Sequence, residues 1–391
     1  MQRRTFLQGS IAAAVAAATS SHALAQSATS HAASAPPAFP PVDDRSVWLV
    51  GDWGAPPNAV TMSTRLAGLV QGTSPDRRDK IMDSYQDGGA VAELEKAFAR
   101  LLGKEDCAFF PSGTLANNVA VRVLCGENRR ALVQHESHLY RDESDAAQRL
   151  SGINLVPLAP DRATPTLDEV REAVDESENG PFPMKIGAVS LESPVRRADG
   201  EMVPLDAVRA IAKFARGHGA RLHLDGARLL LAPPAFDIGA YAAEFDTIYV
   251  SLYKYLGAPF GAVLAGSKAD IAEARDLRHV YGGALYQCWM PALLAHDGLS
   301  TFPRDIARAH ARAAQLIDAL VASGKVRDAS NPNPSNIHRL AMAQDFAAAA
   351  FERGRQAGVR IGGWKDGNIP LFVNTSLLRR PVEELAALFL G

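Results

Sequence analysis

A lysine and an aspartate, 29 residues apart, each follow an apolar stretch and carry side chains suited to carbonyl chemistry. Asp225 ends the stretch 222–224, and Lys254 stands between the apolar run 247–250 and a Gly-Ala-Pro turn. Apolar and aromatic neighbours partly desolvate a lysine, which favours the neutral amine that forms a Schiff base. A carboxylate at the end of a strand can hold a ring N–H in its charged form. The alternatives are an ion pair between Asp225 and Arg228 and an ordinary surface lysine.

A short turn before a predicted helix has the groups that bind an anion. Ser112, Gly113 and Thr114 directly precede the helical stretch 115–124. Such a turn offers backbone N–H groups, two hydroxyls and the positive end of a helix dipole, which together suit a phosphate. Ordinary helix capping is the alternative, because Ser and Thr cap many helices.

His138 completes a set of four features that one cofactor would need. It follows the apolar run 131–133, and a histidine at a strand end can stack on a planar ring or move protons. A surface histidine is the alternative. An anion site, a ring clamp, a carboxylate and an amine are what pyridoxal 5′-phosphate requires. The set therefore predicts this cofactor, with Lys254 and His138 as catalytic residues.

The composition excludes several classes of protein. The chain has 391 residues, 47% of them hydrophobic and 21% charged, and a net charge of −2. A nucleic-acid binder would show a basic excess, and a mean hydropathy of −0.07 argues against a multi-span membrane protein. Its three cysteines, Cys107, Cys125 and Cys288, are too few for a disulfide framework and lack metal-site spacing. We therefore expect no metal and no nucleic-acid partner.

Helices that alternate with short apolar strands must position these residues. Helices are predicted at 90–102, 115–124 and 205–217, and strands at 131–133, 186–191, 221–224, 247–250 and 261–265. In the first helix, Val91, Leu94, Phe98 and Leu101 share one face. Strands separated by helices predict an α/β fold with a mostly parallel sheet and helices on both faces. Ligands bind such sheets at the carboxyl ends of the strands. This large domain is predicted to span 46–300.

The pattern changes near residue 300. A long amphipathic helix is predicted at 304–323, strands at 337–341, 359–361 and 370–373, and helices at 345–357 and 381–390. These elements predict a small C-terminal α+β domain over 301–391.

The N-terminal residues have the pattern of an export signal. Residues 1–25 begin with Arg3-Arg4, continue with an apolar run and end in an A-x-A-like site, which resembles a twin-arginine signal peptide. An Ala-rich tail is the alternative. Residues 26–45 are rich in Ser, Ala and Pro and are expected to form a flexible linker. We therefore expect a periplasmic protein that is exported with its cofactor and has no membrane partner once the signal is removed.

Five stretches form a combined pattern. They are Tyr85–Val91, PSGTLAN at 111–117, SHLY at 137–140, LHLDGAR at 222–228 and YKYLGAPFGAVLAG at 253–266. With them, residues 58–391 resemble the threonine aldolase and β-eliminating lyase family of fold-type-I pyridoxal-phosphate enzymes. The resemblance implies the fold of the pyridoxal-phosphate-dependent transferases and pyridoxal 5′-phosphate as cofactor. It also implies active sites at a subunit interface, and hence a homodimer or homotetramer.

The resemblance also implies a role for each motif residue. Lys254 would bond covalently to the cofactor aldehyde, Asp225 would hold the pyridine nitrogen, and His138 would stack on the ring. The phosphate would lie on Ser112, Gly113 and Thr114. Arg228 would contact the ring oxygen side or the substrate carboxylate.

The predicted substrate pocket departs from the family pattern. No Arg-Ser-Asp-Thr stretch is found between residues 45 and 65, and Val195 stands where a histidine near the substrate hydroxyl is expected. Tyr286 occupies a place where some aldolases carry arginine. Leu371 or Phe372 stands where a second carboxylate-binding arginine is expected.

Three other residues could compensate for these losses. Arg379 and Arg380 follow the missing arginine by a few positions, and His135 could replace the missing base. We therefore expect the substrate range to shift from threonine toward bulkier or aromatic β-substituted amino acids.

The leading interpretation is a pyridoxal-phosphate lyase that cleaves a β-hydroxy-α-amino acid to glycine and an aldehyde. Another reaction with the same cofactor, such as β-elimination, racemisation or transamination, is the first alternative, favoured by the missing histidine. A non-catalytic exported binding protein on the same scaffold is the second, and the retained Lys254 and Asp225 argue against it.

Overall fold

The computed structural model describes residues 41–54 and 58–391. The predicted signal peptide, 1–25, and most of the predicted linker, 26–45, lie outside the described residues. In the described part of the chain, no helix is both long and apolar enough to cross a membrane.

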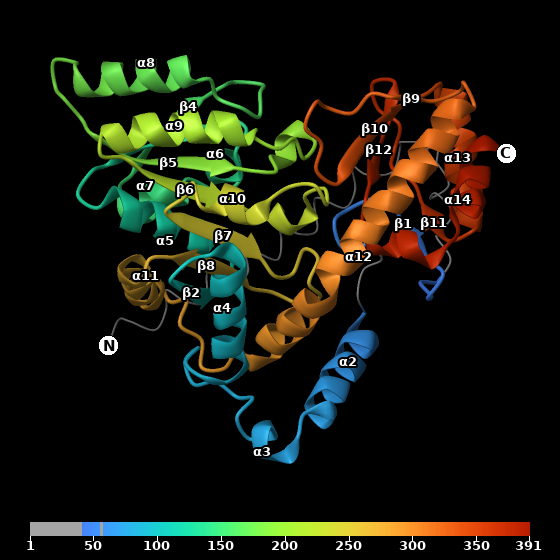
Figure 1. Cartoon of the computed structure of the whole chain (residues 1–391), viewed down its shortest axis with the longest axis horizontal. Helices are drawn as coiled ribbons and strands as arrows, with labels where there is room; N and C mark the ends of the chain where they lie inside the picture. Colours follow the sequence, from blue (N-terminus) through green and yellow to red (C-terminus); the bar gives the residue numbers. More distant parts are fainter. Residues whose placement is uncertain (1–40, 55–57) are drawn as a thin grey trace, which may run out of the picture. The chain divides into compact units, whose positions relative to one another are not determined.

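A seven-stranded sheet forms the larger part of the fold (Figure 1). Its strands are, in spatial order, β2 (Asp106–Phe110), β8 (Ala262–Gly266), β7 (Thr247–Ser251), β6 (Arg221–Asp225), β5 (Ile186–Glu192), β3 (Arg130–Gln134) and β4 (Asn154–Leu158). Only β8 runs antiparallel to its neighbours in this sheet. The predicted α/β fold with a mostly parallel sheet is therefore confirmed. Strands β2 and β4 were not predicted.

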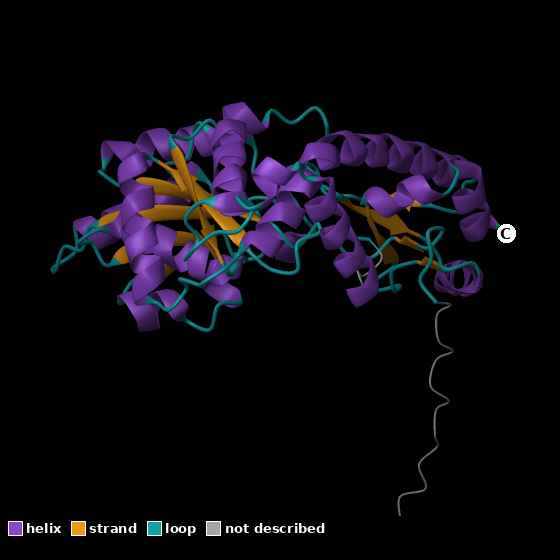
Figure 2. Cartoon of the chain, turned by 90° about the horizontal axis from the view of Figure 1, so that it is seen from below, coloured by secondary structure: helices purple, strands orange, loops and turns teal. Residues whose placement is uncertain are grey.

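Helices cover both faces of this sheet (Figure 2). Alternate residues of β2 show why: Cys107 and Phe109 join one core cluster, and Ala108 and Phe110 join another. The first cluster includes buried residues of α4 (Gly89–Leu102) and α9 (Leu205–Gly217), and the second those of α5 (Gly113–Cys125) and α11 (Lys268–Val280). Further helices are α6 (His138–Arg141), α7 (Ala146–Ser151), α8 (Leu167–Glu178) and α10 (Ile238–Ala242).

The predicted helices 90–102, 115–124 and 205–217 match α4, α5 and α9 to within about two residues at each end. One side chain of α4 was placed wrongly. Leu101 is exposed, and Leu102 packs in the core with Val91, Leu94 and Phe98. The i+4 spacing from Phe98 to Leu102 keeps the apolar face on the sheet.

The C-terminal part has a second sheet of three antiparallel strands. Their order is β12 (Asn368–Phe372), β10 (Ile337–Ala341) and β9 (Arg327–Asp328). Helices α13 (Gln344–Gln356) and α14 (Val382–Leu390) accompany it. A short strand near the N-terminus, β1 (Val47–Trp48), pairs with β11 (Val359–Arg360), so residues predicted to begin the large domain lie against the C-terminal part.

One long helix joins the two parts. Helix α12 (Trp289–Ala322) begins 15 residues before the predicted start at Arg304, so that predicted start is wrong. Pro303 lies inside the helix, and a proline removes one helical hydrogen bond, which favours a start just after it. Buried side chains on both sides of it, such as Leu294 and Ile306, bind α12 to the core. The predicted domain boundary at residue 300 falls within this helix, and the contacts group residues 40–391 as one compact unit.

Helix α12 contacts the segment that follows Lys254 at a position that only glycine allows. A Cβ added to Gly298 would lie 2.1 Å from the carbonyl oxygen of Leu256. Backbone atoms cannot rotate away as side-chain ends can, so this contact fixes the distance between α12 and the loop after β7.

We predict that Gly298→Ala lowers the free energy of unfolding by about 1–3 kcal/mol, because the new methyl group pushes α12 away from Leu256. Urea unfolding followed by circular dichroism measures this loss. Gly68→Ala is the matched control, since Gly68 lies in the exposed helix α2 (Ala59–Gly72) with no atom within 4 Å of the added Cβ. It should stabilise by about 0.5–1 kcal/mol through helix propensity. Equal changes in the free energy of unfolding for the two substitutions would contradict the close contact between Gly298 and Leu256.

Candidate active site

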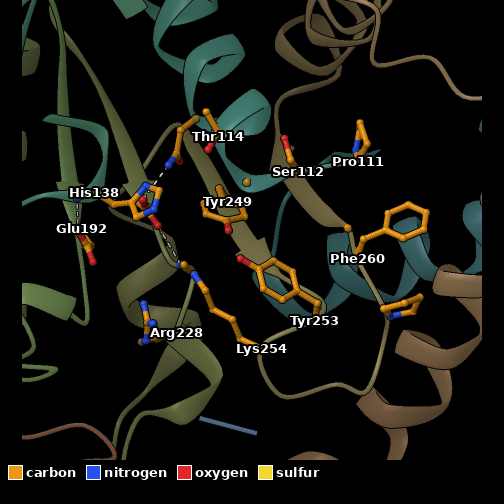
Figure 3. A pocket seen from close by; sticks show the side chains of 16 residues that line it. Pro111, Ser112, Thr114, His138, Glu192, Arg228, Tyr249, Tyr253, Lys254 and Phe260 are labelled. Carbon is orange, nitrogen blue, oxygen red and sulfur yellow. Dashed lines mark hydrogen bonds between the residues drawn. The ribbon is translucent and has the colours of Figure 1, made fainter. Parts of the chain in front are cut away.

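All of the predicted site residues line one pocket at the carboxyl ends of the parallel strands (Figure 3). The pocket has a cavity volume of about 320 Å³, near the lower end of the range for small-molecule sites. The predicted residues that line it are Ser112, Gly113, Thr114, His138, Asp225, Arg228 and Lys254. Five further pocket residues had been assigned no role: Glu192 and Tyr249, which lie outside the motif stretches, and Asn117, Tyr253 and Phe260, which lie within them.

The N-terminus of α5 forms one side of the pocket. Ser112 is the N-cap, and its hydroxyl accepts a hydrogen bond from the Leu115 N–H at 3.3 Å. A Cβ added to Gly113 would lie 2.1 Å from the Tyr249 hydroxyl oxygen. Only glycine therefore fits between the tyrosine and the start of the helix, where unpaired N–H groups can face an anion.

Asp225 is buried at the end of β6 with donors on both carboxylate oxygens. Its Oδ2 accepts a hydrogen bond from Asn117 Nδ2 at 2.7 Å, and its Oδ1 accepts one from the Ala227 N–H at 3.1 Å. Asn117 lies one helical turn after Gly113 on the buried side of α5. That spacing was the sequence signal that could have identified it.

His138 begins α6 and is held by two buried acidic residues. Its Nδ1 lies 2.9 Å from Glu143 Oε1, and its backbone N–H donates to Glu192 Oε2 at 2.6 Å. The hydrogen bond to Glu143 raises the pKa of His138 above its usual value. Burial, together with the nearby Asp225 charge, raises the pKa of Glu192 to about 7.

Lys254 is buried between β7 and the turn that leads to β8. Burial, together with the neighbouring Arg228 charge and against the opposing effect of Asp225, lowers its pKa to about 8. Its Nζ lies 5.8 Å from the centre of the Tyr253 ring. At pH 7, about one tenth of this amine is therefore uncharged and nucleophilic, far more than for a lysine with an ordinary pKa.

Arg228 lines the pocket and is also part of a buried ion pair. Its Nε donates to Asp52 Oδ2 at 2.8 Å, and the other oxygen of Asp52 accepts from Asn336 Nδ2 at 3.2 Å. The ion pair that Arg228 forms in the structure is therefore with Asp52, and not with Asp225 as the alternative interpretation had it. Asp52 belongs to the stretch 45–65, where no substrate-binding motif had been found.

The residues proposed to compensate for the missing family residues lie elsewhere. Arg379 donates to the carbonyl oxygens of Asp43 and Ser46, and Arg380 donates to that of Arg45. His135 pairs with Glu136 at 2.6 Å and does not line the pocket.

The residues at the positions of the missing family residues lie outside the pocket too. Leu371 and Val195 are buried and apolar, and Tyr286 is exposed against Tyr85. Among the residues that line the pocket in the described part of the chain, Arg228 is the one arginine.

His138, Glu143 and Asp225 form a cluster whose potential ligand atoms all lie within 4.8 Å of one another. Hydrogen bonds account for this cluster. The Asn117 amide donates to both carboxylates, at 2.9 Å to Glu143 and 2.7 Å to Asp225. A cation placed among these groups would face the N–H hydrogens of the amide, so the arrangement favours a hydrogen-bonded network.

We predict that Lys254 reacts with aldehydes in a pH-dependent manner, with a midpoint near pH 8. Because only the neutral amine reacts, labelling should rise as the pH increases through this value. Reductive labelling with formaldehyde and cyanoborohydride, followed by peptide mapping between pH 6 and 10, measures the midpoint. The exposed Lys268 serves as the internal reference. Identical labelling profiles of the two lysines would contradict the predicted desolvation.

Comparison with known proteins identifies the family of this chain and several similar proteins. The family model for beta-eliminating lyases matches residues 78–343. A low-specificity L-threonine aldolase from Candida albicans is 29% identical over 60% of this chain and 63% of its own length. An alanine racemase from Cochliobolus carbonum is 30% identical over 56% of each chain. The chain thus spans less than two thirds of the length of these curated relatives.

A solved structure extends the likeness to nearly the whole fold. A protein from Listeria monocytogenes, provisionally described as an L-allo-threonine aldolase, is 25% identical and has a TM-score of 0.73. The match covers 88% of this chain and 95% of that protein. Since the family model matches more than half of the sequence, the chain belongs to the beta-eliminating lyase family.

Proposed function

We propose that the pocket binds pyridoxal 5′-phosphate. The residues fit its functional groups: the N-terminus of α5 at Ser112–Thr114 suits the phosphate, and the buried Asp225 suits the ring nitrogen. His138 would lie against the ring, and Lys254 would bond to the aldehyde. The close fit of Gly113 against Tyr249 supports the phosphate position, because it leaves the backbone of the turn free of side chains.

We further propose that the protein cleaves a β-hydroxy-α-amino acid to glycine and an aldehyde by a retro-aldol reaction. When bound, the cofactor supplies an electron sink for the carbon–carbon bond that breaks. Lys254 accepts and returns protons, for which a pKa of about 8 is suited near neutral pH. Arg228 binds the substrate carboxylate while Asp52 fixes its guanidinium through Nε.

One observation carries this proposal. A single pocket brings together Lys254, Asp225, His138 and the N-terminus of α5, which come from separate parts of the chain. The names of the relatives, several of them threonine aldolases, support the reaction class.

The substrate range is proposed to favour aromatic or bulky β-substituents over threonine. The family pattern predicts two arginines for the substrate carboxylate, but this pocket offers only Arg228 among its described residues. Arg228 is already paired with Asp52. The loss of one Arg–carboxylate contact costs on the order of 2–3 kcal/mol. Tyr253 and Phe260 add aromatic surface at the pocket.

We predict that the purified protein with bound cofactor cleaves phenylserine with a kcat/KM at least about tenfold above that for threonine. Release of benzaldehyde and of acetaldehyde measures the two reactions, and allo-threonine tests the stereochemistry. Lys254→Ala should reduce both by about three orders of magnitude or more, whereas Lys268→Ala should leave them unchanged. Equal rates for threonine and phenylserine would contradict the substrate assignment, and full activity of Lys254→Ala would contradict the mechanism.

Racemisation is the second candidate reaction. It needs no base at a β-hydroxyl, and Val195 provides none at the position of the expected histidine. A relative that is 30% identical, from Cochliobolus carbonum, is named an alanine racemase, which supports this candidate. Conversion of L-alanine to D-alanine without aldehyde release would favour this reaction over cleavage.

We also propose that the protein forms a homodimer or homotetramer. Helix α2 buries none of its residues within the described chain, and the Tyr85–Tyr286 pair is exposed. A second copy that covered these surfaces would remove apolar and aromatic groups from water. Light scattering at micromolar concentration tests this, and the mass of one chain, 41.7 kDa, would contradict it.

The cellular location is proposed to be the periplasm, reached by the twin-arginine route. The proposal is based on the Arg3-Arg4 pair and the apolar run that follows it. Arg3→Lys with Arg4→Lys should keep the protein in the cytoplasm, as fractionation and immunoblotting would detect. Unchanged export would contradict the route.

A further inference from the structure

We propose that Asn117 is a positioning residue that links Asp225 to the His138–Glu143 pair and fixes the hydrogen on Nδ1 of His138. The inference builds on the proposed cofactor site, but its evidence is the hydrogen-bond network of the chain itself.

Asn117 is the amide that bridges two buried carboxylates. Its Nδ2 donates one hydrogen to Asp225 Oδ2 at 2.7 Å and the other to Glu143 Oε1 at 2.9 Å. Both acids are buried, with 2% and 4% of their surface exposed. Two like charges this close repel strongly where water is excluded, and a donor placed between them offsets the repulsion.

His223 and Thr247 determine which way the amide points. His223 Nε2 lies 3.0 Å from Asn117 Oδ1, and its Nδ1 lies 2.9 Å from the Thr247 hydroxyl. Burial lowers the pKa of His223 to about 4, so the ring is neutral and has one N–H. Since the amide nitrogen must donate to the carboxylates, its oxygen must accept from Nε2–H, and Thr247 must donate to Nδ1.

The hydrogen bonds of Glu143 likewise determine which ring nitrogen of His138 carries a hydrogen. Glu143 accepts on Oε1 from Asn117 and from His138 Nδ1, and on Oε2 from Asn118 Nδ2 at 2.8 Å. Glu143 thus holds a hydrogen on Nδ1 of His138. In the described structure, Nε2 of His138 has no hydrogen-bond partner of its own and is the ring nitrogen that remains for a bound molecule.

The acidic groups that act on His138 come from two strand ends and one turn. Glu143 follows α6, Asp225 ends β6 and Glu192 ends β5, and all three favour the charged imidazole. A change at Asn117 alters two of these three acids at once. We infer that Asn117 couples the ring-nitrogen partner of the proposed cofactor to the histidine that would lie against its ring.

The test compares Asn117→Ala and Asn117→Asp with Asn118→Ala. Asn118 is the matched control because it lies next to Asn117, is buried and donates to Glu143, but donates no hydrogen bond to Asp225. The first readout uses protein without cofactor. Imidazole nitrogen and carbon shifts of labelled histidines are recorded between pH 5 and 8, with His138 and His223 assigned by the signals lost in His138→Gln and His223→Gln.

In the unaltered chain, His223 should remain neutral with its proton on Nε2, and His138 should titrate above its usual range. In Asn117→Ala, we expect His223 to lose its single tautomer and the midpoint of His138 to fall, because two carboxylates without a shared donor take up a proton between them. In Asn117→Asp, which keeps the side-chain volume, His223 should become protonated within the measured range. Asn118→Ala should leave the His223 tautomer unchanged.

The second readout is the affinity for pyridoxal 5′-phosphate, measured by equilibrium dialysis. Asn117→Ala should weaken it about tenfold or more, and Asn118→Ala by less than threefold. Unchanged His223 and His138 signals in both Asn117 variants would overturn the proposal. Equal losses of affinity in Asn117→Ala and Asn118→Ala would also overturn it. If the unaltered chain bound no cofactor, the proposed function would fail while the first readout still decided the role of Asn117.

Discussion

Buried carboxylates at one edge of the sheet are the constraint on which the pocket depends. Asp225, Glu143 and Glu192 are all removed from water, and an ionised acid in a dry interior is costly unless hydrogen-bond donors or cations surround it. The chain supplies those donors from the Asn117 amide and from the backbone and ring of His138. The positions of charge in the pocket are therefore set by the protein before any ligand binds, which is the condition for electrostatic preorganisation.

The positive side of the pocket depends on segments far apart in the sequence. Lys254 and Arg228 lie near one another, which helps to lower the pKa of the lysine. Arg228 is held by Asp52, and Asp52 is held by Asn336, which lies 284 residues later just before β10. This series of contacts links the N-terminal segment and the C-terminal sheet to Arg228, so a change in either segment would alter the position of this arginine in the pocket.

Local patterns accounted for most of the main sheet and for the principal site. Strands β3, β5, β6, β7 and β8 are short apolar runs, and this pattern can be recognised within each run alone. Strand β4 was not predicted because Asn154 and Pro157 are exposed and interrupt its apolar pattern. The start of α12 was misplaced because the cost of Pro303 is local, whereas the packing that outweighs it comes from other elements.

By itself, the sequence determined the fold class, five of the seven strands of the main sheet and the motif residues Ser112–Thr114, Asp225 and Lys254, because each has a local pattern. Only the tertiary structure decided their partners. Asn117 ends the stretch 111–117 but was assigned no role there, Glu143 lies in no motif, and Asp52 lies in a stretch that departs from the family pattern. Each of the three nevertheless lies within hydrogen-bond distance of a predicted site residue. Such pairings depend on where strands end and how loops return over the sheet edge, which is a property of long-range packing that no short segment of sequence contains.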